Sequence, residues 1–254
     1  MTLTRAVTIA LAACVASAPC AGAAQTAKLK VAFSPNRAGQ RTTIELALRV
    51  SGPAGAPPSP VTSFDLRMPA SLGIATTTLG EANCAPAALF KSGLEGCSAN
   101  SRMGFGTATA VVPLGPELIT EKATLDALMG QSGEDRIEVL FYLQAAQPVF
   151  AQLVLPSVLQ ESTPPYGERL DTSVPLIQAW PEGPYLALQT FNSTLGPSHL
   201  TYYRQEGRRT VAFKPRGVRL PITCPAGGYP FEAILNFLDG TQTTARYRVP
   251  CPAH

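Results

Sequence analysis

Four cysteines in the body of the chain have the type and the spacing to do definite chemistry. They are Cys84, Cys97, Cys224 and Cys251, and four cysteines allow three pairings. Pairing Cys84 with Cys97 and Cys224 with Cys251 closes two local segments, so we predict these two disulfides. The first bridge closes a loop of about 14 residues, which stabilises the fold by on the order of 3 kcal/mol. A zinc site would need ligands at Cys-x-x-Cys spacing, which neither pair has.

The sequence carries no complete catalytic motif. A Ser-His-Asp triad would have to use His199, in the turn-like segment Gly-Pro-Ser-His-Leu, or His254, the last residue. Gly104 and Gly106 lie in a strand-like run that no helix or lysine follows, which argues against a phosphate loop. Acidic residues are frequent from Glu117 onward, but nothing in their spacing selects a carboxylate pair for glycoside hydrolysis. We therefore predict no catalytic residue, no cofactor and no metal ligand.

Two groups of residues have the chemistry of a binding site. The densest basic cluster could meet an anionic envelope polymer, although charge runs are more often solvated faces. It comprises Arg204, Arg208, Arg209, Lys214, Arg216 and Arg219. Trp180 lies in a turn-like Trp-Pro-Glu-Gly-Pro segment, so we expect it to be partly exposed. With Tyr166, Tyr185, Tyr202 and Tyr203 it could form a platform for a sugar ring, although aromatic residues on short strands are more often core. The tentative binding residues are Trp180, Arg208 and Arg209.

The composition predicts the elements that must position these residues. Charged residues make up 15% of the chain, below the usual quarter, and 24 prolines and 21 glycines provide turns. This profile is typical of many short strands joined by tight turns. The net charge is only +3, which argues against a nucleic-acid binder because such a protein carries a concentrated basic field.

Alternation of apolar and polar residues predicts most of the strands. Residues 42–50 and 61–68 are expected to pair across the proline-rich loop 51–60. Residues 80–103 are expected to be an irregular excursion held by the first disulfide. Residues 156–184, with six prolines and Trp180, read as a long surface connection or a domain boundary. Further strands are expected at 28–34, 104–112, 117–129 (strand in preference to helix), 136–143, 149–155, 185–191, 199–204 and 209–214.

A β-hairpin is predicted from Pro230 to Val249, between the last two cysteines. A two-residue turn at Asp239-Gly240 would set Phe231 opposite Arg248. A type I turn followed by a glycine bulge sets Phe231 opposite Tyr247 and Glu232 opposite Arg246 instead. Register follows the hydrophobic pattern, and opposite charges stabilise a pair of strands, so we predict the bulged turn.

The N-terminus predicts export. Arg5 precedes an apolar run from Ala6 to Val15, and Ala21-Gly22-Ala23 fits the small-x-small cleavage rule. Residues 1–23 are therefore predicted to be a cleaved signal peptide, which contains Cys14 and Cys20. Residues 24–254 form the mature, secreted chain, in which no later segment is long and apolar enough to span a membrane. Disulfides suit that oxidising compartment.

Two blocks of the chain resemble secreted β-rich proteins of high-GC Gram-positive bacteria, a family of unknown function. They are Cys97-Ser-Ala-Asn-Ser-Arg-Met-Gly-Phe-Gly and the region from Cys224-Pro to Cys251-Pro252. The resemblance implies compartment and fold but no activity. We predict an all-β, antiparallel β-sandwich, Ig-like or jelly-roll-like, as one large or two small sandwiches. The predicted function is a secreted or envelope-associated structural or interaction module. A domain that binds carbohydrate or envelope polymer is the alternative, and a glycoside hydrolase-type enzyme is the least favoured.

Overall fold

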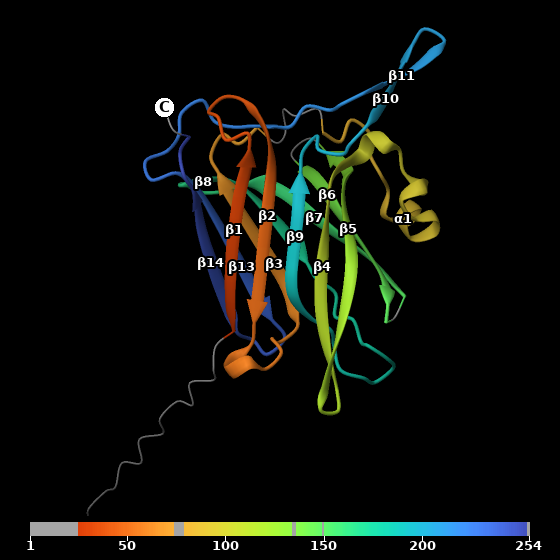
Figure 1. Cartoon of the computed structure of the whole chain (residues 1–254), viewed down its shortest axis with the longest axis vertical. Coiled ribbons are helices and arrows are strands. Elements are labelled where there is room, and N and C mark those ends of the chain that lie inside the picture. Colours follow the sequence, from red (N-terminus) through yellow and green to blue (C-terminus); the bar gives the residue numbers. More distant parts are fainter. Residues whose placement is uncertain (1–24, 74–78, 134–135, 149, 253–254) are drawn as a thin grey trace, which may run out of the picture.

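The computed structural model describes residues 25–73, 79–133, 136–148 and 150–252 (Figure 1). The predicted signal peptide and His254 lie outside the described residues. The strands are β1 Thr26–Ser34, β2 Arg41–Ser51, β3 Val61–Pro69, β4 Arg102–Leu114, β5 Glu117–Gly133, β6 Arg136–Gln147, β7 Ala151–Glu161, β8 Tyr166–Ser173, β9 Ala187–Leu195, β10 Tyr202–Glu206, β11 Arg209–Phe213, β12 Val218–Arg219, β13 Tyr229–Phe237 and β14 Gln242–Val249. The helices are α1 Pro86–Ser92 and the short η1 Pro53–Gly55, η2 Gly93–Gly96 and η3 Ala99–Ser101.

Twelve strands form one antiparallel sheet. Their order is β1-β2-β9-β4-β5-β6-β7-β8-β3-β13-β14, and β12 pairs with the start of β2. The sheet curls until β14 lies against β1, so we call it the barrel (Figure 1). The predicted all-β, antiparallel class is confirmed. The sandwich prediction is not confirmed, because one curled sheet takes the place of two sheets packed face to face.

Strand direction assigns each connection to one end of the barrel. Because every strand runs antiparallel to its neighbours, the connections β2–β3, β4–β5, β6–β7, β8–β9 and β13–β14 share one end. This end is drawn lowest in Figure 1, and we call it the lower end. The upper end carries α1, the loops around both disulfides, and the β10–β11 hairpin, which projects from the body.

Side chains close the seam between the two edge strands. At the lower end, the Gln25 amide donates to Asp239 Oδ2 over 3.1 Å. At the upper end, the Asn36 amide donates to the Pro250 carbonyl over 2.9 Å. Between them the Phe33 ring contacts the ring of Phe231, with centroids 5.9 Å apart. The barrel is therefore closed by packing at a place where strand pairing does not close it.

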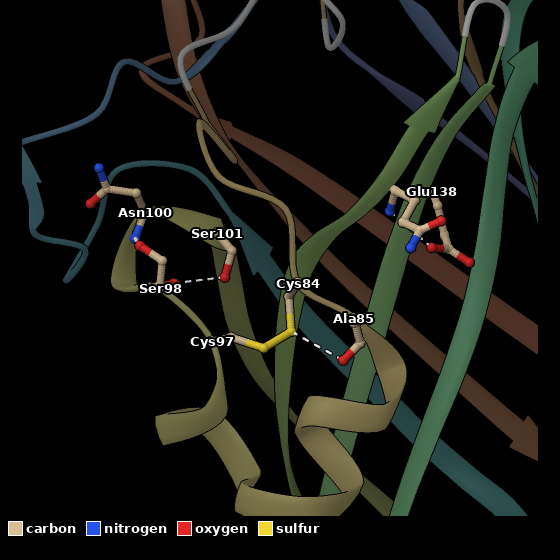
Figure 2. The surroundings of a disulfide bond; sticks show 8 residues. Cys84, Ala85, Cys97, Ser98, Asn100, Ser101 and Glu138 are labelled. Carbon is tan, nitrogen blue, oxygen red and sulfur yellow. Dashed lines mark hydrogen bonds between the residues drawn. A yellow bond between two sulfur atoms is a disulfide. The ribbon is translucent and has the colours of Figure 1, made fainter.

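Two apolar cores lie on opposite faces of the sheet. Inward side chains of nearly all barrel strands form the main core. A second cluster lies outside, where α1 covers β5, β6 and β7, and contains Cys84, Leu89, Leu128, Leu140, Tyr142 and Val154. Figure 2 shows the Cys84–Cys97 disulfide that ties the start of α1 to the chain before η3. Residues 80–103 were expected to be irregular, but the structure places three short helices there because apolar residues such as Leu89 must cover the outer cluster.

Both predicted disulfides and the predicted hairpin register are confirmed. The Cα atoms lie 5.3 Å apart in Cys84–Cys97 and 5.8 Å apart in Cys224–Cys251. Phe231 pairs with Tyr247 and Glu232 pairs with Arg246. Gly240 has φ +79°, and the amide of Phe237 donates to the Thr241 carbonyl over 3.0 Å, as a bulged turn requires.

Two strand predictions are wrong. β2 and β3 do not pair across the proline loop: β2 lies between β1 and β9, and β3 lies between β13 and β8. Loop 51–60 instead crosses the lower end of the barrel. The range 156–184 is not a long connection, because β7 continues to Glu161 and β8 occupies Tyr166–Ser173. β8 gave a weak signal, since Leu170 is its only large aliphatic residue. The domain division suggested near 156–184 stays a prediction.

Candidate functional site

A row of four alanines hollows out the lower part of the barrel. Ala108 pairs with Ala123, Ala123 with Ala145, and Ala145 with Ala151. The row thus crosses four neighbouring strands, β4 to β7, at one level, and all four side chains face the interior cavity. Inward side chains have to be large if they are to fill a barrel interior, which widens as the number of strands increases. A row of methyl groups in register leaves that space open.

The open space is a cavity of about 140 Å³. The four alanines form one wall. The same row continues with larger side chains, Phe191 of β9 beside Ala108 and Leu48 of β2 beside Phe191. The β8–β9 connection folds over the lower end and contributes Val174, Leu176, Ile177 and Leu186 to the lining. The cavity lining is therefore almost entirely apolar, and a loop covers the cavity below.

Three phenylalanines form the floor of the cavity. Phe191 lies between the other two, with ring centroids 6.1 Å from Phe64 and 5.5 Å from Phe141. The same three residues also line a deeper void of about 40 Å³ in the middle of the barrel. Their rings therefore separate two apolar spaces that lie in line along the barrel interior.

Glu121 is the one charged side chain among the described residues that line the cavity. It pairs with Ala110, and Ala110 pairs with Leu188, close to the start of β9. This level is the lower rim of the barrel, so the carboxyl lies at the mouth and not at the floor. The residue is 9% exposed. The cavity thus has a deep apolar part and a single acidic group near its entrance, as an amphipathic ligand requires.

Trp180 lies beside this entrance. The β8–β9 connection folds back on itself: Leu186 donates to the Ile177 carbonyl over 2.9 Å, and Gly183 donates to the Trp180 carbonyl over 2.8 Å. Trp180 is at the tip of this turn, 41% exposed, with its indole packed over Gly183. The residues at the base of the turn line the cavity, so a ligand that moves the turn would change the surroundings of the indole.

Arg208 and Arg209 lie far from the cavity, at the tip of the β10–β11 hairpin. The hairpin is held at its base: the Asn100 amide donates to the Tyr203 carbonyl, and the Tyr203 amide donates to Asn100 Oδ1, each over 2.8 Å. Both arginines are exposed. The structure therefore separates the tentative binding residues, with Trp180 at the lower end and the two arginines at the upper end.

The proposed aromatic platform is not assembled. Tyr202 is fully buried, and its hydroxyl is held between the amide of Gly80 and the carbonyl of Arg102. Tyr203 is on the upper hairpin, whereas Tyr185 is in the lower β8–β9 connection. His199 is exposed, with its ring against Phe105 at 5.6 Å between centroids.

A carboxyl pair lies on the outer face of the barrel. Asp65 and Asp171 are directly opposite each other on β3 and β8. Burial, and then the hydrogen bond and charge of Asp171, raise the pKa of Asp65 to about 6. Asp171 also accepts from Arg169 over 3.2 Å. Two carboxyls in direct contact share a proton, whereas glycoside hydrolysis needs carboxyls about 5–10 Å apart across a bound sugar. This pair does not have that geometry.

Nearby, Glu232 is a buried carboxylate held by two arginines. Its oxygens lie 3.1 Å from Arg67 and 2.5 Å from Arg246. The three residues lie on adjacent strands, β3, β13 and β14, and lock the terminal hairpin to the barrel. Within the described ranges, no group of three or more His, Cys, Asp or Glu residues is arranged to hold a metal ion.

The partly buried carboxyl of Glu168 should make the stability of the barrel depend on pH. Burial raises its pKa to about 7, and its Oε2 has no hydrogen-bond partner in the described part of the chain. A raised carboxyl pKa favours folding below the unfolded pKa of about 4.3, and this contribution is lost as the pH rises through 7. Glu168→Gln should therefore raise the free energy of unfolding by about 1–2 kcal/mol at pH 8.5, with solvent screening allowed for.

Urea unfolding at pH 8.5 and pH 3.5 measures this effect. The gain of Glu168→Gln over the natural chain should disappear at pH 3.5, where both side chains are neutral. Glu182→Gln, in the exposed lower turn, is the matched control. An equal gain at both pH values would show that ionisation of Glu168 is not the cause.

A second depression, of about 520 Å³, lies on the outer face of β1, β2, β9 and β4. Its lining is mixed: Lys30, Glu45 and Asn192 lie beside apolar side chains such as the ring of Phe105. An extended groove of this kind is where a carbohydrate polymer, the alternative ligand predicted from the sequence, would lie. It contains none of the three tentative binding residues.

Sequence reasoning missed the alanine row, which is the main feature of the site. Alanine is a weak signal in a strand: in 117–129 the alternation that includes Ala123 predicted a strand but gave no sign of a cavity. The strand register carried the information: once β4–β5, β5–β6 and β6–β7 are aligned as hairpins, Ala108, Ala123, Ala145 and Ala151 fall on one line. No helix in the described ranges is long and apolar enough to cross a membrane.

Comparison of the chain with family models, with curated proteins and with solved structures finds no match. The resemblance to secreted proteins of high-GC Gram-positive bacteria therefore stays a prediction. The site must be interpreted from its own geometry: an apolar cavity with a wall of alanines, an aromatic floor and an acidic group at its mouth.

Proposed function

We propose that this protein is a secreted binding module whose barrel takes up the apolar part of a small amphipathic molecule. The observation that carries the proposal is the alanine row of β4 to β7, which opens a cavity in a barrel that larger residues would have filled. The predicted signal peptide and the two disulfides support an extracellular setting. The proposal thereby narrows the interaction role predicted from the sequence to the binding of a small amphipathic molecule.

The size of the cavity sets the size of the ligand. Its volume, about 140 Å³, is close to that of an engineered apolar cavity of roughly 150 Å³ that binds benzene. A ring or an alkyl chain of about six carbons fits such a space. Burying about six methylene groups contributes roughly 5 kcal/mol, which corresponds to a dissociation constant on the order of 0.1–1 mM.

The acidic mouth sets the polar end of the ligand. Glu121 lies at the lower rim, where the head group of a ligand held by its tail would be. A carboxylate accepts hydrogen bonds from hydroxyl or ammonium groups and repels another carboxylate. The favoured ligand class is therefore an alcohol or amine with a short alkyl or ring substituent, in preference to a free fatty acid.

Ala145→Leu tests the proposal by filling the cavity. We expect the variant to bind 1-octanol at least about tenfold more weakly than the natural chain, because the added carbons occupy the space of the tail. Titration calorimetry measures the affinity. The fluorescence of Trp180, the only tryptophan in the chain, gives a second readout at the entrance.

Ala146→Leu is the matched control. Ala146 is the next residue on β6 but is exposed on the outer face, so the same substitution should leave octanol binding unchanged. Octylamine should bind at least as tightly as octanol, and octanoate more weakly. Failure of the natural chain to bind octanol or octylamine, or equal losses in Ala145→Leu and Ala146→Leu, would refute the proposed function.

A further inference from the structure

The lower end of the barrel exposes an unusual share of the large apolar side chains. Among the described residues, nine large apolar side chains are exposed. Six of them lie at the lower end: Leu114, Leu118, Phe150, Leu176, Trp180 and Leu238. The other three are Phe90 on α1, Tyr203 on the upper hairpin and Ile222 in the loop before Cys224. We call the group of six the apolar rim.

The apolar rim is distributed over four separate connections. Leu114 and Leu118 are at the β4–β5 tip, and Phe150 is in the β6–β7 turn. Leu176 and Trp180 are in the β8–β9 connection, and Leu238 is in the β13–β14 turn. All four connections share the lower end, as Figure 1 shows. Leu176 also lines the cavity, so the rim is continuous with the cavity lining.

The connections of the lower end carry negative charge only. The ranges 52–60, 114–118, 148–150, 174–186 and 238–241 contain three acidic residues, Glu117, Glu182 and Asp239, and no lysine or arginine. The basic cluster is on the upper hairpin and the loop after it. Exposed Lys28, Arg49 and Lys122 on the adjoining strand ends offset this charge, so the lower end is close to neutral. An anionic partner would therefore be attracted to the upper end and not to the lower end.

We infer that the apolar rim docks on the surface of a lipid layer whose head groups are zwitterionic or uncharged. Exposed apolar patches of this kind mark lipid or protein contacts. Single Leu, Phe and Trp side chains on separate turn tips suit a fluid layer, into which each inserts independently. Tryptophan is favoured at the boundary between lipid and water. The exposed side chains of the rim stand on separate turn tips, whereas a peptide is bound along an unpaired strand edge or in a groove.

Docking in this orientation turns the cavity mouth toward the lipid. That consequence rests on the proposed function, since it makes the lipid layer the source of the amphipathic ligand. The docking itself requires only the exposed rim and its charge. Ligand uptake by the cavity and docking by the rim can therefore each be present without the other, and separate measurements distinguish them.

Sedimentation with vesicles of phosphatidylcholine tests the docking. The purified full chain should partition onto the vesicles, and the double variant Leu118→Ser/Phe150→Ser should lower the partition coefficient at least about tenfold, because two large apolar side chains no longer leave water. The control removes two equally exposed apolar residues elsewhere, Phe90→Ser/Ile222→Ser. It should partition like the natural chain.

Two further measurements show which lipid head groups the protein binds and which of its ends makes the contact. Replacing a quarter of the lipid by phosphatidylglycerol should not strengthen binding, and Arg208→Ser/Arg209→Ser should not weaken it. Binding that requires the anionic lipid, or that falls with Arg208→Ser/Arg209→Ser, would overturn the docking proposal and assign the contact to the upper hairpin. Failure of the natural chain to sediment with phosphatidylcholine would overturn it as well and leave a protein partner as the occupant of the rim.

The cavity variant separates the two proposals. Ala145→Leu keeps the rim and should sediment like the natural chain while it loses octanol. Octanol binding without vesicle binding would sustain the proposed function and refute the docking, and vesicle binding without octanol binding would do the reverse.

Discussion

Gly106→Ala is expected to lower the free energy of unfolding by about 3 kcal/mol, one of the largest losses that a single methyl group can cause here. Gly106 is in β4 and pairs with Ser193 of β9. A Cβ atom at this position would lie 1.9 Å from the carbonyl oxygen of Asn192. That oxygen belongs to the backbone of the neighbouring strand, so relief requires a shift of β9 and not a side-chain rotation.

Urea unfolding followed by circular dichroism measures the loss. Gly133→Ala is the matched control, because Gly133 is also in a strand, β5, and an added Cβ there would meet nothing within 4 Å. It should change stability by no more than about 0.5 kcal/mol. Equal stabilities of Gly106→Ala and the natural chain would mean that β4 and β9 separate more easily than their spacing indicates.

The close approach of β4 and β9 also matters for the cavity. Gly104 faces the same constraint, with an added Cβ 2.1 Å from the Thr194 carbonyl oxygen. The two glycines let the backbone of β9 lie close against β4 at this point. The alanine row begins two residues later, at Ala108, opposite Phe191 of β9. The glycines of this strand-like run thus allow the close strand pairing beside which the alanine row begins.

Local features of the fold could be predicted from the sequence. The disulfides followed from proximity along the chain, and the hairpin register followed from Glu232 opposite Arg246 and Phe231 opposite Tyr247. Most strand positions followed from alternation. In each case the residues that pair lie within a few tens of residues of each other, so a short stretch of sequence is enough to predict the pairing.

The closure of the sheet could not be predicted in the same way. β9 inserts between β2 and β4, and β3 inserts between β8 and β13. Both insertions join strands that are far apart in sequence. Alternation of apolar and polar residues shows which face of a strand is buried but not which strands are its neighbours. A sandwich and a barrel therefore present the same pattern. The cavity was hidden for the same reason, since alanines signal an empty space only when their strands are aligned.

The apolar rim was only partly visible in the sequence. Trp180 was expected to be exposed because of its turn-like neighbours, and it is. Leu118 and Phe150 were read as members of strands, where apolar residues are normally buried. Their exposure depends on the β4–β5 tip and the β6–β7 turn extending past the barrel. Such exposure is a property of the closed barrel and cannot be assigned to one segment.

Phe191→Ala is expected both to destabilise the protein and to lengthen the ligand that it accepts. Phe191 is 6% exposed and packs against Phe64 and Phe141, so its truncation should cost about 3–5 kcal/mol of stability. Its ring also separates the cavity of about 140 Å³ from the void of about 40 Å³. Without the ring the two spaces join, and an alkyl chain can continue past the former floor.

A series of linear alcohols from hexanol to dodecanol measures this second effect. In the natural chain the affinity should stop rising when the tail reaches the phenylalanines, and in Phe191→Ala it should keep rising toward dodecanol by about fivefold or less per added methylene. Phe33→Ala is the control, because Phe33 is equally buried, at 7% exposure, and lines neither space. It should lose comparable stability and keep the natural preference. If Phe191→Ala keeps the natural dependence of affinity on chain length, the substitution only destabilises the protein. The aromatic floor would then have no part in ligand selection.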